Sequence, residues 1–305
     1  MNEFWDQGTR PDGRLFAQCR PTVLATSLLK HSVGSALVKQ GNTKILVANT
    51  IQIGQPSPEF PDHGDVLVSV SSNTNGSSSR SANDNNQGML LLLQAWLQRM
   101  LDEWLPPKLN LLTGRACFRL IVTVLVLKDD GNIRDASLFA CAAAWNSTKL
   151  PQMHQDFQDV DGKLWLKKDS QPQQQQRQQQ SKSSESSSLS LPSSDNNDKV
   201  KIVTATTTTN SEKSSCRISL TMGVVKIGDN DKKIKLLLDP TSVEEKQLSG
   251  LLTCVICLPS YTIQMDYSGG SSSSSAAALL LSASDLALAY KLTKARADEL
   301  SRLLL

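Results

Sequence analysis

The sequence has 305 residues, of which 39% are apolar, enough to bury one large hydrophobic core or two modest ones. Lys and Arg total 32 against 29 Asp and Glu, and a net charge of +3 does not by itself predict nucleic-acid binding. The first residues lack a basic stretch followed by an apolar one, and no window approaches about eighteen apolar residues, so we expect an intracellular protein that neither is secreted nor spans a membrane.

Residues 1–18 predict an N-terminal arm, followed by a series of strands. The arm contains TRPDGR, a turn sequence flanked by Arg10 and Arg14, which we expect to be solvated. Alternating and β-branched residues then predict strands at about 20–29, 34–39, 44–53 and 66–70. Gly41-Asn42 predicts a hairpin turn, and the proline-rich segment 54–65 predicts an extended loop.

Two segments of low apolar content interrupt these elements. Residues 71–88 are dense in Ser and Asn and predict a mobile loop in which Arg80 is the only cation. Residues 169–199 are mostly Gln, Ser, Asn and charged groups, and we expect a disordered insertion there. Between them, an apolar helix is predicted at 89–104 and ends before Pro106-Pro107.

The stretch from Arg119 to Trp145 predicts a strand, a tight turn and a helix around which the remaining chain is organised. Residues 120–127 form an apolar run rich in Val and Ile, typical of a central strand covered on both faces. The sequence DDGN supplies the turn. Small and apolar residues then recur at helical spacing, and we expect this helix to pack closely on the strand.

The start of that helix contains opposing signals for an anion site. Unpaired backbone amides and the positive end of the helix dipole favour a bound phosphate. Asp135 in the first turn would neutralise the dipole and repel an anion, whereas Arg134 beside it would attract one.

The second half of the chain repeats the order of strands followed by a helix. A short strand is predicted at about 163–166, before the insertion. After the insertion, strands are predicted at about 216–226, 233–238, 251–258 and 261–265, and a helix at 284–304. We therefore expect an α+β protein with two related strand-strand-strand-helix lobes whose sheets pack on helices. The expected division is an arm (1–18), a first lobe (19–168), the insertion (169–199) and a second lobe (200–305).

The cysteines and histidines predict no metal or cofactor site. The six cysteines have no secretory context, so reduced thiols are expected. Cys254 and Cys257 form a C-x-x-C spacing, but on a predicted strand residues three apart point to opposite faces. The three histidines are scattered along the chain.

Five short stretches occur as a series over most of the chain: RPDGR at 10–14, GSALVKQGNT at 34–43, PDHGDVLVSV at 61–70, DDGNIRDAS at 129–137 and LLLDPTSVEE at 236–245. In order and spacing this series resembles the ribonuclease PH family, and within it the ring subunits of the eukaryotic RNA exosome. The D-G-N-x-x-D-A pattern, the DPT sequence and Glu244-Glu245 look like the non-phosphorolytic branch, and are most similar to the ribosomal-RNA-processing protein 43 type of subunit.

The resemblance implies a ribonuclease PH fold and a six-member ring of related subunits around a channel for single-stranded RNA. Implied partners are other ribonuclease PH-like ring subunits, S1/KH cap subunits and RNA, with no membrane. Implied processes are rRNA maturation and mRNA turnover, in the nucleus, nucleolus and cytoplasm.

The resemblance also bears on the site residues. Active relatives bind phosphate with arginines from an IQRLIGR-like helix and a GGTR turn, but the helix here offers only Arg99. The positions that correspond to the phosphate and acid site would be vestigial, namely Arg134, Asp135, Asp239 and Glu245. We therefore expect no catalytic residues and no enzymatic activity. In relatives the loop that contains Arg80 faces the channel entrance, which implies that Arg80 contacts RNA.

Three hypotheses follow. The first is a non-catalytic exosome ring subunit, a structural scaffold and part of an RNA path. The second is a phosphate-dependent 3′–5′ exoribonuclease, or half of a composite phosphorolytic site completed by a neighbour. The third is a binding module whose Gln-rich insertion recruits partners. Purely structural roles also stay open: Arg134 pairing with Asp130 or Asp135, Asp239 capping a turn, and RPDGR as a structural turn.

Overall fold

The computed structural model describes residues 4–5, 8–73, 80–151, 153–155, 164–166, 201–203, 216–227, 233–269 and 281–304. The chain divides into two compact units, which are described separately. The first unit comprises Met1–Lys149 and Thr206–Leu305, and the second comprises Leu150–Ala205. The predicted insertion at 169–199 lies outside the described residues.

A six-stranded sheet forms one layer of the first unit. Its order is β1 (Thr22–Thr26), β2 (Gly34–Gln40), β3 (Thr43–Gly54), β6 (Ala116–Lys128) and β4 (Asp65–Ser72), and the short β5 (Asn110–Leu112) also pairs with β6. All neighbours are antiparallel except β4 and β6, which are parallel. The turn predicted between β2 and β3 is confirmed, and Gly41 adopts a positive φ of 58° there, a conformation that glycine tolerates well.

Strand β6 lies between β3 and β4, as the prediction of a central strand requires. The expectation that both of its faces are covered is wrong. Leu120, Val122 and Val124 are buried, whereas Arg119 and Thr123 on the other face are exposed. The apolar run suggested two covered faces because partly exposed Ile and Leu residues alternate with the buried ones.

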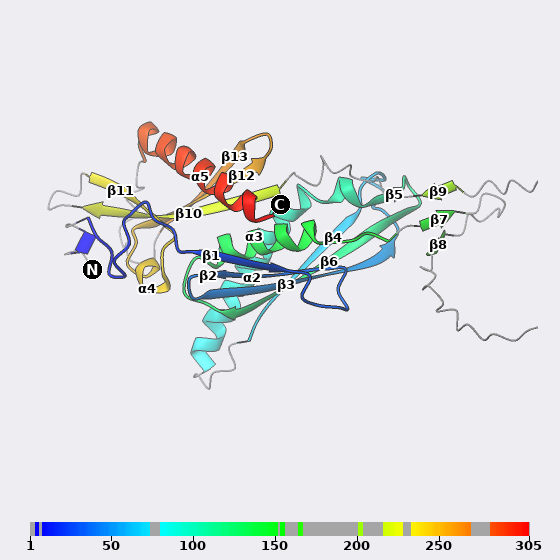
Figure 1. Ribbon diagram of the computed structural model, residues 1–305, viewed down its shortest axis with the longest axis horizontal. Helices are drawn as coiled ribbons and strands as arrows, with labels where there is room; N and C mark the ends of the chain where they lie inside the picture. Colours follow the sequence, from blue (N-terminus) through cyan, green and yellow to red (C-terminus); the bar gives the residue numbers. More distant parts are fainter. Residues whose placement is uncertain are drawn as a thin grey trace, which may run out of the picture. The chain divides into compact units, whose positions relative to one another are not determined.

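Helix α3 (Ile133–Asn146) packs against β2 and β3 of this sheet and against β10 of a second sheet (Figure 1). Ala136, Ala140 and Ala143 are fully buried in it. Small side chains allow the helix backbone to approach both sheets closely. The helix was predicted to pack on the strand at 120–127, which is β6, but its main contacts are with β2, β3 and β10.

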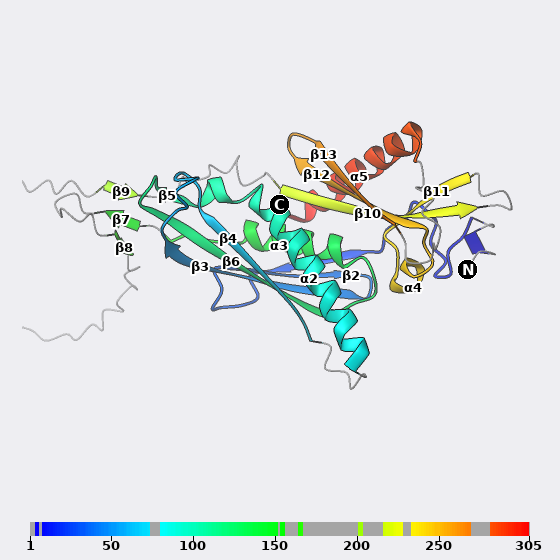
Figure 2. The same cartoon turned by 180° about the vertical axis from the view of Figure 1, so that it is seen from behind.

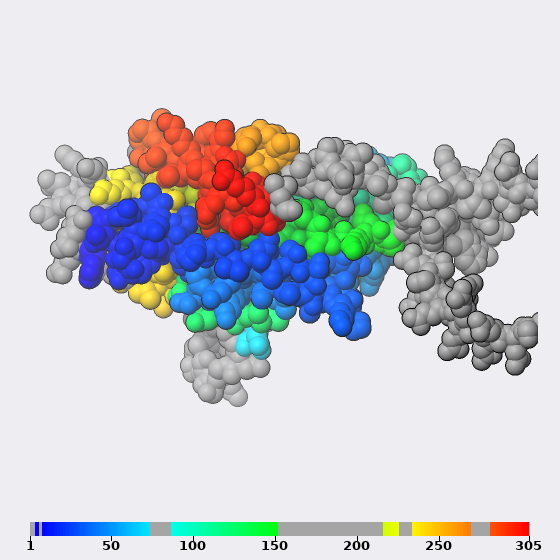
Figure 3. All heavy atoms as spheres, viewed as in Figure 1, coloured from blue at the N-terminus to red at the C-terminus, as the bar shows by residue number. Residues whose placement is uncertain are grey.

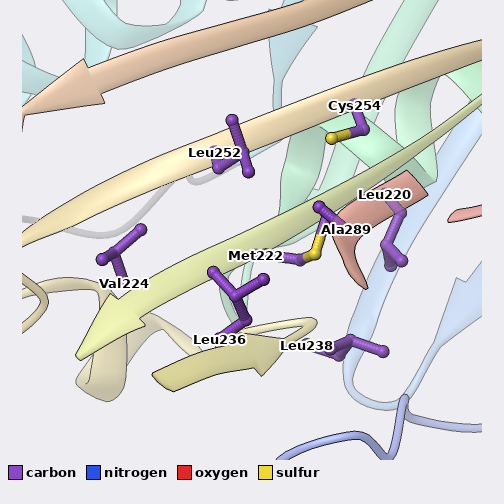
Figure 4. Packing of buried hydrophobic residues seen from close by; sticks show 8 residues of the cluster. All are labelled: Leu220, Met222, Val224, Leu236, Leu238, Leu252, Cys254 and Ala289. Atoms are coloured by element: carbon purple, nitrogen blue, oxygen red, sulfur yellow. The ribbon is translucent and has the colours of Figure 1, made fainter. Parts of the chain in front are cut away.

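The second sheet is antiparallel, with the order β11 (Lys233–Leu238), β10 (Cys216–Ile227), β12 (Gly250–Leu258) and β13 (Thr262–Gly269). Helix α5 (Ala283–Leu304) packs against β10 and β12. Figure 4 shows the apolar cluster that joins them, which contains Leu220, Met222, Val224, Leu236, Leu238, Leu252, Cys254 and Ala289. The α+β class is therefore confirmed.

Helix α2 extends further towards its N-terminus than the sequence predicted. It spans Arg80–Asp102, so residues 80–88 are helical rather than part of a loop. The apolar residues from about 89 onward pack against β4, so the helix is already stabilised there (Figure 2). Because no proline occurs in residues 80–88, further helical turns can extend from it towards the N-terminus. The predicted stop is confirmed, since α2 ends before the 3₁₀ helix η1 (Pro106–Leu109).

Segments from both ends of the chain lie side by side in the first unit. Figure 3 shows the N-terminal residues (dark blue) beside the C-terminal helix (red), and Arg296 of α5 donates a hydrogen bond to Thr22 of β1. The short helix α4 (Ser242–Glu245), which the sequence analysis did not predict, begins with a capping box between Thr241 and Glu244.

The second unit contains a three-stranded antiparallel sheet in the order β8 (Leu164–Leu166), β7 (Met153–Gln155) and β9 (Lys201–Val203). The strand predicted near residues 163–166 corresponds to β8. Among the helices that the structure describes, none is long and apolar enough for a membrane crossing.

Candidate functional site at the start of α3

The turn that precedes α3 is shaped by two residues in the left-handed region. Asn132 has a φ of 54° and Gly131 a φ of 84°. A Cβ atom at Gly131 would collide with the backbone of Thr241 and Ser242, so the turn fits closely against the segment that leads into α4. The amide of Ser242 donates to the carbonyl of Asp130 at 3.1 Å. The turn before α3 is thereby attached to the residues that connect β11 with α4.

Asp135 is buried and faces strand β10. Its carboxylate accepts hydrogen bonds from the amide and the hydroxyl of Thr221, at 2.6 and 2.9 Å, and from Asn132 Nδ2 at 2.8 Å. Burial raises the pKa of Asp135 above its ordinary value, although these bonds oppose the shift. The carboxylate thus joins α3 to the second sheet and is directed into the interior.

Asp239 is completely buried and accepts bonds from four side chains, one of them Arg14, which donates from Nη1 at 3.5 Å. Arg20 donates from Nε at 2.9 Å and from Nη2 at 2.7 Å, and Gln40 and Asn132 each donate at 2.8 Å. Burial alone would raise the pKa of Asp239, but the hydrogen bonds and charge of Arg20 hold it below its usual value. All of these contacts are structural, and they leave Asp239 enclosed by protein groups.

The RPDGR arm is also held in the interior. Arg10 is 1% exposed and donates from Nε to Glu244 Oε1 at 2.8 Å, and its other nitrogens bond to Glu244 and to the carbonyls of Leu238 and Asp239. The expectation that Arg10 is solvated is therefore wrong, because Glu244 of α4 and the carbonyls of Gln18, Leu238 and Asp239 accept hydrogen bonds from its guanidinium. Arg14, which is less buried, bonds to Asp12 at 2.6 Å.

A small cavity of about 150 Å³ lies at the same start of α3, on the side that faces α2. Arg134 and Glu245 line it, together with apolar side chains of α2 and β12 and with Asn132, Ile133 and Thr221. The guanidinium carbon of Arg134 lies 5.9 Å from the ring centroid of Trp96. The described ion pairs join Arg134 to neither Asp130 nor Asp135, so the pairing considered from the sequence is not formed there.

Glu245 has an unusual protonation equilibrium. Its Oε1 accepts a hydrogen bond from the Asn132 amide at 2.7 Å. Burial raises the pKa of Glu245 to about 7, and the negative charge of Asp129 adds to this effect. A carboxyl group with this pKa exchanges a proton near neutral pH, as a general acid or base requires.

The four predicted positions are thus close together but fall into two groups. Arg134 and Glu245 line the cavity, whereas the carboxylates of Asp135 and Asp239 already accept hydrogen bonds from buried protein groups. Asn132 bonds to three of them, and the sequence analysis assigned it only a turn role. Its position directly before a helix, in a turn that needs positive φ, is the signal that could have identified it.

Other predicted residues lie elsewhere. Arg80 is the first residue of α2, and its side chain lies outside the described side chains, so its contact with RNA stays a prediction. Arg99 is paired with Asp266 of β13 at 2.6 Å. All six cysteines are free thiols. Within the described ranges, no group of three His, Cys, Asp or Glu residues is arranged to hold a metal ion.

Comparisons with known proteins identify a matching family model and similar sequences. Residues 18–151 match domain 1 of the 3′ exoribonuclease family, RNase_PH. The chain is 31% identical to the exosome complex component Rrp42 of Methanosarcina acetivorans over 49% of this chain and 57% of that protein. It is 27% identical to Rrp42 of Thermococcus gammatolerans over 54% of this chain and 61% of that protein. The matches therefore span about three fifths of the length of these relatives.

Solved structures share the fold over almost the whole chain. A chain of the Archaeoglobus fulgidus exosome with RNA bound to the active site has a TM-score of 0.63 and 22% identity, and covers 99% of this chain and 95% of its own. Rice Rrp46 has a TM-score of 0.55 and 17% identity, with 97% of both chains covered.

These findings correct one prediction and leave another open. The expectation that the chain is not an enzyme is overturned, because the family that it matches is one of exoribonucleases and the relatives are exosome components named Rrp42. The finer assignment to the ribosomal-RNA-processing protein 43 type stays a proposal. Residues 18–151 thus match the first domain of the 3′ exoribonuclease family RNase_PH, and the chain shares its fold with solved exosome chains.

Proposed function

We propose that this chain is a ring subunit of an exosome-type assembly that processes and degrades RNA from its 3′ end. The match of residues 18–151 to the exoribonuclease family model, the similarity to exosome components and the shared fold support this role. In this proposal the subunit is a scaffold for its neighbours and part of the path of single-stranded RNA, and its partners are other ribonuclease PH-like subunits and S1/KH cap subunits.

Exposed apolar side chains on α2 support an assembled state. Met89, Leu91 and Leu92 are 41%, 59% and 70% exposed, respectively. Consecutive exposed apolar residues of this kind are costly in water and are typical of surfaces that a neighbouring subunit covers. In the proposed ring, subunit contacts would bury this part of α2.

The cavity at the start of α3 carries the chemical part of the proposal. Arg134 supplies a cation beside the helix N-terminus, and Glu245 supplies a group that exchanges protons near neutral pH. Phosphoryl transfer requires several cooperating charges, and one arginine is too few. We therefore assign this chain half of a composite, phosphate-dependent site, and the remaining cations belong to a neighbouring subunit.

The test uses the purified assembly with tagged wild-type or variant chain. Arg134→Gln is expected to lower phosphate-dependent release of nucleoside diphosphates from poly(A) by roughly 100-fold, since it removes a charge that acts in the transition state. Arg115→Gln, an exposed arginine in the turn before β6, is the matched control and should leave the rate unchanged. Equal rates for the Arg134 variant and wild type would refute the composite site, and failure to co-purify ribonuclease PH-like subunits would refute the ring role.

Three further assignments belong to this proposal. Arg80 contacts RNA at the channel entrance, and the chain acts in the nucleus, nucleolus and cytoplasm. The division into an arm (1–18), two lobes (19–168 and 200–305) and an insertion (169–199) is also proposed. Filter binding of RNA by an Arg80→Ala assembly, imaging of a tagged chain, and assembly after deletion of the insertion test these assignments.

A further inference from the structure

A second, larger cavity of about 640 Å³ lies in the first unit, between the loop after β3 and the end of α2. It shares no lining residue with the cavity at the start of α3. Its polar and aromatic lining comprises Phe60, His63, Asp65, Asp102, Glu103 and Arg119, and two prolines of η1 complete the wall. A volume of this size accommodates one or two side chains of another molecule.

The lining is acidic, and one of its carboxylates lacks a cation. Arg119 donates to Asp65 at 2.6 Å, and Arg217 donates to Glu103 at 2.8 Å. Asp102 accepts a bond from the Gln98 amide at 2.7 Å, but the described ion pairs include none to Asp102. Burial raises the pKa of Asp102, and the charge of Asp65 adds to the shift, so an incoming cation would relieve an unfavourable environment.

Other residues that line the same cavity are apolar or aromatic. Phe60 is 58% exposed, and its ring meets the His63 ring edge-on with the centroids 5.6 Å apart. The prolines of η1 extend this surface. A carboxylate and an accessible aromatic ring in one cavity can together bind a guanidinium group, through paired hydrogen bonds to the carboxylate and a cation–π contact with the ring.

We propose that this cavity binds an arginine side chain from a basic segment of a partner protein. The guanidinium lies at Asp102 and Glu103, and the aliphatic part of the side chain lies along the prolines and Phe60. RNA does not fit this site, because three carboxylates outnumber the two arginines paired with them, Arg119 and Arg217, and the remaining negative charge repels phosphate.

The proposal is tested by NMR titration of the isotope-labelled full chain with a capped peptide, Ac-Gly-Gly-Arg-Gly-Gly-NH₂, at low salt. The matched peptide contains citrulline, which keeps the shape of arginine without its charge. The arginine peptide should shift amide signals of residues 60–66 and 102–103, and the citrulline peptide should bind at least about fivefold more weakly, as loss of a charge-assisted contact implies.

Two variants locate the site. Asp102→Asn should weaken binding of the arginine peptide about fivefold, and Phe60→Ala should weaken it by a similar factor. Glu299→Gln neutralises an acid on α5 that does not line the cavity, and it should bind as wild type does. Equal affinities of the two peptides, an equal loss in the Glu299 variant, or displacement of the peptide by oligo(U) would each overturn the proposal.

Discussion

Replacing Arg10 by methionine is expected to destabilise the first unit by about 3–5 kcal/mol, the usual cost of removing one partner from a buried ion pair. The side chain of Arg10 has no exposed surface, and that of Glu244 has 2%. The variant leaves the Glu244 carboxylate buried without its cation, and it removes the donors to the carbonyls of Leu238 and Asp239. Methionine keeps a similar volume, so the loss reports charge and hydrogen bonding rather than a cavity.

The assay is equilibrium unfolding in urea, followed by tryptophan fluorescence, with the slope of the transition compared between variants. Arg119→Met is the matched control, because its pair with Asp65 is about half exposed, and exposed pairs contribute about 0–1 kcal/mol. The double variant Arg10→Met, Glu244→Gln should recover much of the loss, because no buried charge is left unpaired and glutamine keeps the capping box with Thr241.

A loss for Arg10→Met below about 1 kcal/mol, similar to the exposed control, would refute the reasoning, because breaking a buried pair costs several times more than breaking an exposed one. A double variant no more stable than the single variant would refute the pairing itself. In that case the bonds to the two carbonyls, and not the carboxylate, would account for the stability.

Two other predictions concern the start of α3 and its core. The folded pKa of Glu245 lies near 7, above its unfolded value, so Glu245 contributes stability at low pH that is lost as the pH rises through about 7. Glu245→Gln keeps the bond from the Asn132 amide but cannot ionise, and it should stabilise the protein by roughly 1–2 kcal/mol at pH 8 but not at pH 4. The measurement is urea unfolding at both pH values. An equal effect at both pH values would contradict this linkage. Ala140→Leu should destabilise by about 2–3 kcal/mol, seen as a lower melting temperature, because α3 is enclosed by two sheets; an unchanged melting temperature would show that the sheets can separate.

The order and type of the elements could be predicted because they depend on local patterns. The Val-rich run gave β6, the alanine spacing gave α3, and Pro106-Pro107 marked the end of α2. Element limits were less accurate where the sequence is polar, as at residues 80–88, since a helix anchored elsewhere can extend through them. The short α4 has too few residues for an apolar period.

The site could be predicted only in part, because its contacts join residues far apart in the chain. Arg134 and Glu245 were identified by resemblance, and the structure brings both to one cavity. The partners that enclose Asp239 could not be found from local patterns, since Arg20 is 219 positions away from it. A single sequence also does not show that Arg10 and Arg14, which flank a turn and were expected to be solvated, are both held inside: the side chain of Arg10 is 0% exposed, and that of Arg14 is 11% exposed and bonded to Asp239.

The separation between the arm and its acidic partners has a consequence for synthesis on the ribosome. Arg10 and Glu244 are 234 positions apart, so at translation rates of about 5–20 residues per second the arginine emerges roughly 10–50 seconds before its carboxylate. The first sheet is complete in sequence by residue 128, well before the second sheet begins. Closure of the arm therefore cannot occur until the segment around residues 239–244 has emerged, and nascent chains halted before residue 239 should remain sensitive to proteases that cut after Arg10 and Arg20.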